Sequence, residues 1–307
     1  MALRAGIDGA ENYVDATTLD TDEAIREAAT RCTVFGRVTP DQKKRLLAAL
    51  KDAGHTVAMT GDGVNDVLAL KEANCSIAMA SGAQAASQVA QLVLLESDFA
   101  AMPAIVGEGR RVINNIQRAA SLFLVKNMLS LGLSLACLVA GFPYPFVPLH
   151  LTLISALTIG VPSFFLAMEP NYERVSGRFL PTVLRRALPG GLTNLIAVFT
   201  AQLIMMNLSF TPGLISTACA AVLATVGMLV LRQTCKPFDL FRHILWWVMA
   251  GALVFCFTVL SGFFDLTRGS LADTLAVLGM MAMAAVMYFA VFKCMGWLTK
   301  HLPRKKQ

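Results

Sequence analysis

The sequence has 307 residues, of which 56% are hydrophobic and only 15% are charged, and its mean hydropathy is +0.60. An average soluble protein carries about 25% charged residues, so this composition excludes a wholly soluble chain and indicates a membrane protein. The formal net charge of +6 does not indicate nucleic-acid binding, because the cations lie between apolar runs and are not interleaved with aromatic residues. The seven cysteines form no CxxC pair, which argues against a zinc site or a disulfide framework.

Residues 1 to about 100 are polar and predict alternating helices and strands. Helices are expected from Asp20, where acidic residues fill the first turn, at 41–53, where Pro40 suits the first position, and at 64–73. Strands are expected at 32–37, 55–59, 75–79 and 91–95. This alternation predicts a doubly wound α/β fold, of which residues 1–100 supply only part. The first 22 residues lack the apolar core of a signal peptide, so we expect this domain to stay in the cytosol.

A glycine-rich loop with two carboxylates follows the strand at 55–59. Gly61 and Gly63 permit backbone angles and close approach that a Cβ would forbid. Asp62 and Asp66 are hard oxygen ligands of the kind that Mg²⁺ takes, and Asn65 adds a neutral donor for a phosphoryl oxygen. Gly, Asp and Asn are also common in plain surface turns, but the whole string after a buried strand favours a phosphate and Mg²⁺ site.

From about residue 100 the pattern becomes helical, and no Gly/Pro/Ser linker separates this helix from the apolar run that starts at Ser121. We therefore expect one helix that continues from the polar domain into the membrane. In this interpretation residues 101–120 form a stalk that couples the two parts mechanically.

Six apolar runs follow, each close to the ~20 residues that span a bilayer, at about 121–141, 147–167, 189–207, 213–231, 244–264 and 274–297. They predict an all-α transmembrane bundle over 121–299, followed by a basic tail at 300–307. The connections after the first and third runs carry no charge, whereas those after the second and fourth runs carry several Arg and Lys residues. Positive residues therefore fall on one side, which predicts a cytosolic N-terminal domain and a cytosolic C-terminus.

Polar residues inside apolar runs are costly and are functional candidates by default. Ser155 and Thr158 are three residues apart and share a helix face, and Gly160 and Pro162 can unwind the helix and free backbone carbonyls as ligands. Lys126 is either a built-in counter-charge or a side chain that extends to the interface. The candidates for a transport site are Lys126, Asn127, Ser130, Ser155, Thr158, Gly160 and Pro162.

The string TGDGVND at 60–66, preceded by GRVTPDQK at 36–43, resembles the C-terminal half of the phosphorylation domain of P-type ATPases. Residues 77–79, 108–111 and 114–115 also resemble family positions that lead into the stalk. That domain has a haloacid-dehalogenase-like fold, and six spans after it resemble the calcium, sodium–potassium and proton pumps. The resemblance implies a partial haloacid-dehalogenase-like α/β domain followed by a six-helix transmembrane bundle, in a calcium-pump-like protein of a bacterial plasma membrane.

The resemblance also implies roles for single residues. Asp62 would hold the catalytic Mg²⁺, Asn65 would contact the phosphoryl group, and Asp66 would order the loop and the metal. Lys43 would neutralise phosphoryl charge, and ATP would bind mostly in domains that these residues do not include. These roles agree with phosphoryl transfer, which needs mainly positioning and charge neutralisation.

The sequence departs from the family pattern in one important respect, because the Asp-Lys-Thr-Gly string that carries the phosphorylated aspartate is absent. The nucleotide-binding domain, the actuator domain and the first four spans are also absent, so we expect a C-terminal portion of a pump that is inactive alone. The alternative is a truncated membrane protein that is inert or regulates an intact pump. A membrane-tethered phosphatase would lack its nucleophile.

The cargo of such a pump depends on the ligands that its spans offer. Asn127 matches a family position that often contributes to cation binding. The first two spans contain no Asp or Glu before Glu169, and Ser130, Ser155 and Ile159 stand where related calcium pumps carry acidic or amide side chains. Ca²⁺ usually takes six to eight oxygens that include carboxylates. Either other spans supply a carboxylate or the cargo is not a doubly charged cation. The resemblance to calcium pumps implies Ca²⁺.

Overall fold

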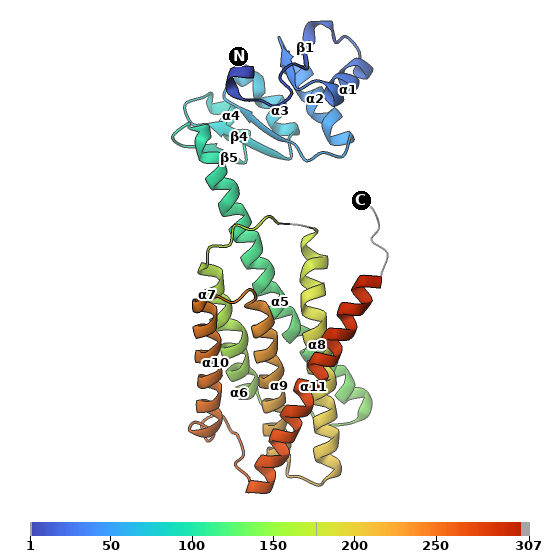
Figure 1. Ribbon diagram of the computed structural model, residues 1–307, viewed down its shortest axis with the longest axis vertical. Coiled ribbons are helices and arrows are strands. Elements are labelled where there is room, and N and C mark those ends of the chain that lie inside the picture. Colours follow the sequence, from blue (N-terminus) through green and yellow to red (C-terminus); the bar gives the residue numbers. More distant parts are fainter. Residues whose placement is uncertain (1, 176, 302–307) are drawn as a thin grey trace. The chain divides into compact units, whose positions relative to one another are not determined.

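The computed structural model describes residues 2–175 and 177–301, and the chain divides into two compact units, at 1–105 and 106–307 (Figure 1).

The first unit alternates short helices and strands, as the sequence predicts. Its helices are η1 (Ala2–Ala5), η2 (Ala16–Thr18), α1 (Asp22–Arg31), α2 (Pro40–Asp52), η3 (Val64–Asp66), α3 (Val67–Glu72), α4 (Gln84–Val89) and η4 (Phe99–Ala101). Its strands are β1 (Tyr13–Asp15), β2 (Val34–Gly36), β3 (Ala58–Gly61), β4 (Cys75–Met79) and β5 (Leu92–Leu94). Thr39 caps α2 in a capping box with Gln42, and Pro40 occupies its first turn.

All strand pairs among the described residues are parallel, which confirms the α/β class. The strands form two sheets, β1–β2 and β3–β4–β5, in place of one continuous layer. In the second sheet Gly61 pairs with Ala78, and Ile77 pairs with Leu92. A buried cluster of Leu70, Ala78 and Ala86 packs one side of this sheet against α3 and α4.

Two local predictions for this unit need correction. The strand expected at 55–59 lies at Ala58–Gly61, so the first glycine of the loop is part of the strand. The helix expected at 64–73 is divided into η3 and α3 at Val67. The capping of η3 by the Gly63 backbone, which donates to Asp66, explains this tight first turn.

The second unit is a bundle of long helices, and α5 (Met102–Ala140) carries the chain into it without a break. The remaining helices are α6 (Pro148–Ser155), the π-helical turn η5 (Ala156–Gly160), α7 (Val161–Met168), α8 (Phe179–Asn207), α9 (Pro212–Thr234), α10 (Leu240–Thr258) and α11 (Leu271–His301). Six helical segments of the described chain are long and apolar enough to cross a membrane. This confirms the six predicted spans by length and composition.

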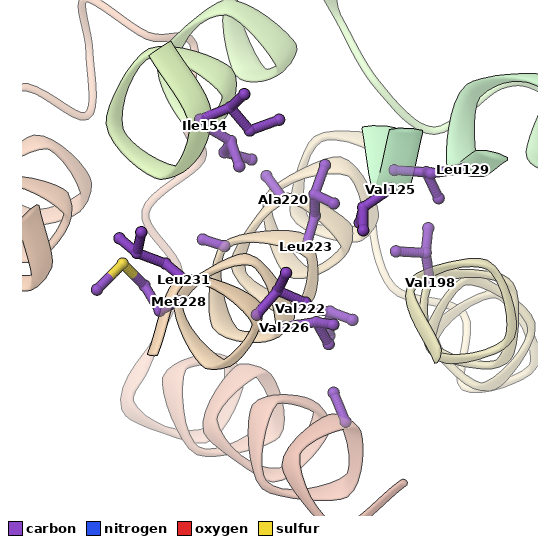
Figure 2. Packing of buried hydrophobic residues seen from close by; sticks show 14 of the residues in the cluster. Val125, Leu129, Ile154, Val198, Ala220, Val222, Leu223, Val226, Met228 and Leu231 are labelled. Carbon is purple, nitrogen blue, oxygen red and sulfur yellow. The ribbon is translucent and has the colours of Figure 1, made fainter. Parts of the chain in front are cut away.

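Helix α9 lies at the centre of the bundle and is the most buried of the six spans. Figure 2 shows Ala220, Leu223 and Val226 of α9 among apolar side chains from α5, α6 and α8. Many of the packed residues are Ala, Val and Cys, and these small side chains let the helices approach closely.

Candidate functional site

The loop after β3 is held by one buried carboxylate. Lys43 Nζ, from α2, donates to Asp66 Oδ1 at 2.6 Å, and the Gly63 backbone N–H donates to Asp66 Oδ2 at 3.3 Å. Asp66 is only 7% exposed, so its charge depends on these two donors. The pair joins two segments that lie 23 residues apart in the sequence.

Gly61 is required by the packing of that carboxylate. A Cβ at Gly61 would lie 2.5 Å from Asp66 Cβ, which is closer than real contacts allow. A Cβ at Gly63 would meet its neighbours at 3.6 Å or more, an ordinary contact. Neither glycine has a positive φ, so close approach at Gly61, and not an unusual backbone angle, is what this loop needs.

A second loop supports the first from the end of β4. The Ala83 N–H donates to the Asp62 carbonyl at 2.6 Å. A Cβ at Gly82 would collide with the same carbonyl oxygen. Sequence reasoning missed Gly82, although a glycine in the loop that follows a predicted strand is a signal for close backbone approach.

The side chains of Asp62 and Asn65 are exposed and make no hydrogen bond or ion pair within the described part of the chain. They are therefore free to meet a ligand, while Asp66 and Lys43 are already engaged with each other. Among residues 2–175 and 177–301 no group of three His, Cys, Asp or Glu side chains forms a ready metal site. Mg²⁺ usually takes one or two protein carboxylates, with waters and phosphate oxygens completing its shell, so the donors Asp62 and Asp66 fit that ion.

A second candidate site lies between the helices of the membrane unit. A small cavity of about 50 Å³ is lined by Lys126, Ser130, Ser155 and Thr158, all predicted from the sequence. A cavity of this size holds a water molecule or a bare ion. Asn127 does not line it and is exposed, and Gly160 and Pro162 lie outside its lining.

Asn194 of α8 also lines this cavity and was missed by sequence reasoning. The residue is 1% exposed, and its Oδ1 has no hydrogen-bond partner in the described structure. An unpaired buried amide oxygen is costly, so this atom is a candidate ligand for a cation. Its position inside an apolar run was the signal that should have found it. Gln202 differs, because its Nε2 donates to the Pro143 carbonyl, in the connection between α5 and α6, at 2.7 Å.

The helix that carries Ser155 and Thr158 is irregular, as Gly160 and Pro162 predict, but it is not unwound. Residues Ala156–Gly160 form a π-helical turn, which often marks functional positions. Pro162 has no N–H to donate to the preceding turn. Thr158 Oγ1 donates to the Ile154 carbonyl at 2.7 Å, which leaves its lone pairs available toward the cavity.

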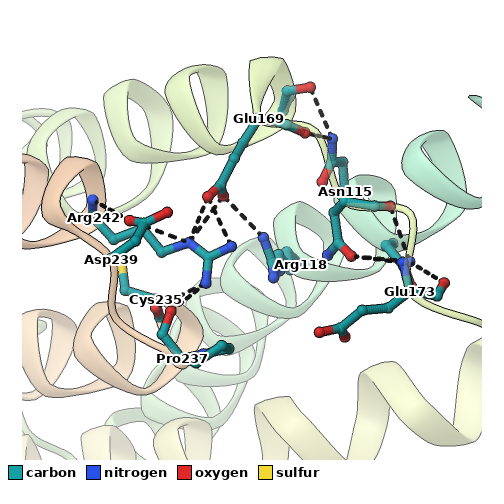
Figure 3. A network of polar contacts seen from close by, with 11 residues as sticks. Asn115, Arg118, Glu169, Glu173, Cys235, Pro237, Asp239 and Arg242 are labelled. Carbon is teal, nitrogen blue, oxygen red and sulfur yellow. Dashed lines mark hydrogen bonds and ion pairs between the residues drawn. The ribbon is translucent and has the colours of Figure 1, made fainter.

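A buried ion-pair network joins the middle of α5 to the end of α7 and the start of α10 (Figure 3). Glu169 follows α7 and accepts from Arg118 of α5 at 3.2 Å and from Arg242 of α10 at 2.8 Å. All three side chains are 8–9% exposed. Asn115 Nδ2 donates to the Ala167 and Glu169 carbonyls, which fixes the same end of α7 to α5.

Comparison with known proteins agrees with the observed fold. A family model described as haloacid dehalogenase-like hydrolase matches residues 4–74. The chain is 40% identical over 262 residues to the probable cation-transporting ATPase exp7 of Streptococcus pneumoniae, covering 82% of this chain and 34% of that protein. It is 38% identical over 296 residues to the calcium-transporting ATPase CtpE of Mycolicibacterium smegmatis, covering 91% of this chain and 37% of that protein.

A more distant relative is the P-type sodium-transporting ATPase4 of Toxoplasma gondii, which is 37% identical over 151 residues. The chain spans roughly a third of the length of the first two relatives. The parallel sheets and the loop after β3 therefore define a haloacid-dehalogenase-like domain, which precedes six helices of membrane-spanning type. The chain belongs to the P-type ATPases, and the first two relatives named above are cation-transporting ATPases.

Proposed function

We propose that the chain forms part of an ATP-driven cation pump that works through an aspartyl-phosphate intermediate. The observation that carries this proposal is the Lys43–Asp66 ion pair at 2.6 Å, on the loop that also presents the free Asp62 and Asn65 side chains. A fixed cation on α2, beside a loop that carries a fixed carboxylate and two free ligands, suits a phosphoryl group and its metal.

Each residue then has a distinct task. Asp62 is the direct ligand of Mg²⁺, and the bound ion would supply charge neutralisation on phosphoryl oxygens. Asn65 donates to the phosphoryl group. Asp66 holds Lys43 and the Gly63 N–H in place, so it acts on the metal and the phosphate mainly by positioning other groups. Lys43 adds the positive charge.

The phosphoryl acceptor comes from elsewhere in the pump, because these 307 residues contain no Asp-Lys-Thr-Gly string. The same holds for most of the ATP site. The chain covers 34% and 37% of its first two relatives, which supports a phosphoryl acceptor and an ATP site outside these residues.

The transport site in this proposal is the cavity beside Asn194, Ser155 and Thr158. Ca²⁺ is the proposed cargo, because it is named for the relative CtpE. The described lining of the cavity offers hydroxyl and amide oxygens but no carboxylate, so other spans would complete a Ca²⁺ shell. The distribution of Arg and Lys supports a cytosolic position for the first unit and the C-terminus, and the bacterial relatives support a bacterial plasma membrane.

Phosphorylation with radiolabelled ATP tests the proposal. The 307-residue chain alone should form no acid-stable acyl-phosphate, whereas a pump that joins it to a region with Asp-Lys-Thr-Gly should form one that depends on Asp62 and on the cation. An acyl-phosphate on the chain alone would contradict the assigned acceptor. Absence of the intermediate in the joined protein would contradict the function.

The missing acceptor string also supports a second candidate, a catalytically inactive membrane protein that regulates an intact pump. Co-expression with a related full-length pump discriminates between the two. A change in the activity of that pump, at unchanged amount, would favour regulation.

A further inference from the structure

The membrane unit contains a large basic cavity, separate from the transport cavity, of about 820 Å³. The charged residues that line this basic cavity are Arg118, Arg178, Arg185, Arg186, Lys236 and Glu173. It lies where α8 begins and α9 ends, so its cations are at one end of the bundle. Its volume falls in the range of small-molecule sites.

Four of the five cations that line the basic cavity have no ion-pair partner within the described part of the chain. Arg118 is paired with Glu169, at 3.2 Å. Arg178, Arg185, Arg186 and Lys236 form no ion pair among residues 2–175 and 177–301. Glu173 is the single carboxylate of the lining. Cations that face one shared space repel one another, and an anion in that space would relieve the repulsion.

One part of the lining of the basic cavity is apolar. Val230 of α9 and the aromatic rings of Tyr288 and Phe292 of α11 line it. Tyr288 stacks on Phe292 with ring centroids 6.1 Å apart, which gives this wall a fixed surface. Phe289, beside them in sequence, is 58% exposed on a span of membrane-spanning type. A basic end and an aromatic wall in one cavity match a molecule with an anionic head and an apolar tail.

We propose that the basic cavity binds the phosphodiester headgroup of an anionic phospholipid, with its glycerol and acyl chains along Tyr288 and Phe292. Basic pockets between membrane helices are typical sites for such headgroups, and arginine forks suit phosphate oxygens. The assignment does not depend on ATP hydrolysis or transport, so it stands or fails separately from the proposed function.

Lipid binding to the full chain in detergent tests this proposal, with bound lipid counted by native mass spectrometry. Phosphatidylglycerol should bind saturably to one site, and phosphatidylcholine should not. The double variant R185Q/R186Q should weaken phosphatidylglycerol binding by about tenfold or more. R174Q is the control, because Arg174 is exposed in the connection before α8 but does not line the cavity, and it should bind like the wild type.

A variant that strengthens binding guards against misfolding as an explanation. E173Q removes the one carboxylate of the lining, while the hydrogen bond from Asn114 goes to the Glu173 backbone and is kept. It should bind phosphatidylglycerol several-fold more tightly than the wild type. Equal binding of phosphatidylcholine, or wild-type affinity in R185Q/R186Q, would overturn the proposal. Displacement of phosphatidylglycerol by inorganic phosphate at equal concentration would assign the cavity to a free anion and overturn the lipid assignment.

Discussion

Lys43 Nζ lies 2.6 Å from Asp66 Oδ1, and this ion pair joins α2 to the loop that follows β3. The Asp66 side chain is only 10% exposed, and that of Lys43 is 34% exposed. Removal of the cation therefore leaves a buried carboxylate with one backbone donor.

The variant K43M should lower the free energy of unfolding of the first unit by about 1–3 kcal/mol, the cost of an unsatisfied buried polar group. The Gly63 amide, which donates to Asp66, should exchange its hydrogen faster, as measured by hydrogen-exchange mass spectrometry. K44M is the control, because Lys44 is the exposed neighbour on the same helix. Equal exchange in the two variants would show that the pair does not order the loop.

The two glycines of the loop should respond differently to a methyl group. G61A forces its Cβ to within 2.5 Å of Asp66 Cβ and should cost about 1–3 kcal/mol in overpacking. G63A meets only ordinary contacts and should be close to the wild type in thermal unfolding. A larger loss in G63A than in G61A would contradict this account of the loop.

Substitution of Glu169 should lower the stability of the second unit more than substitution of an exposed carboxylate does. E169Q leaves Arg118 and Arg242 without their shared carboxylate, and breaking such a buried pair costs about 3–5 kcal/mol. SDS-induced unfolding in mixed micelles measures the loss. E173Q serves as the control, because Glu173 is exposed and its side chain forms no ion pair within the described residues. A similar midpoint for both variants would argue against a stabilising network.

The pKa of Glu72 is held below its ordinary value, first by the hydrogen bond that Lys51 Nζ donates at 2.6 Å and then by the charge of Lys51. A carboxyl with a lowered folded-state pKa contributes stability above its unfolded pKa, and this contribution is lost as the pH falls through the folded value. K51M should raise the Glu72 pKa toward normal in a carboxyl NMR titration. K71M, which changes an exposed neighbour, should leave it unchanged.

Substitutions of Asn194 and Gln202, both in α8, should have different effects on cation binding and on stability. Asn194 Oδ1 is unpaired, so N194L should cost little stability but should weaken binding of radiolabelled Ca²⁺. Gln202 is hydrogen-bonded to Pro143, so Q202L should lower stability and leave cation binding largely intact. Unchanged Ca²⁺ binding in N194L would remove Asn194 from the transport site.

Local signals in the sequence predicted much of this fold. The apolar run Cys75–Met79 is the strand β4 with those bounds, and Thr39 with Pro40 marks the start of α2. The six spans follow from apolar length alone. The strand β1, by contrast, has only three residues and no apolar alternation, so no local pattern marks it.

Contacts between distant segments could not be predicted in the same way. The sequence pointed to Lys43 and Asp66 separately, but their pairing depends on how α2 packs beside η3. The bridge from Glu169 to Arg118 and Arg242 likewise depends on helix packing, because no periodicity relates these positions. Asn127 was expected to line the transport site because it is a polar residue in a span. It is exposed in this chain instead.

In the proposed function Asp62 is the direct metal ligand, and Asp66 acts by holding the loop. Paramagnetic Mn²⁺, as a stand-in for Mg²⁺, tests it by broadening the amide NMR signals of nearby residues in the full chain. Broadening should centre on Gly61 and Gly63 and should disappear in D62N, while D52N, which changes an exposed carboxylate of α2, should behave like the wild type. Unchanged broadening of the loop in D62N would contradict the account.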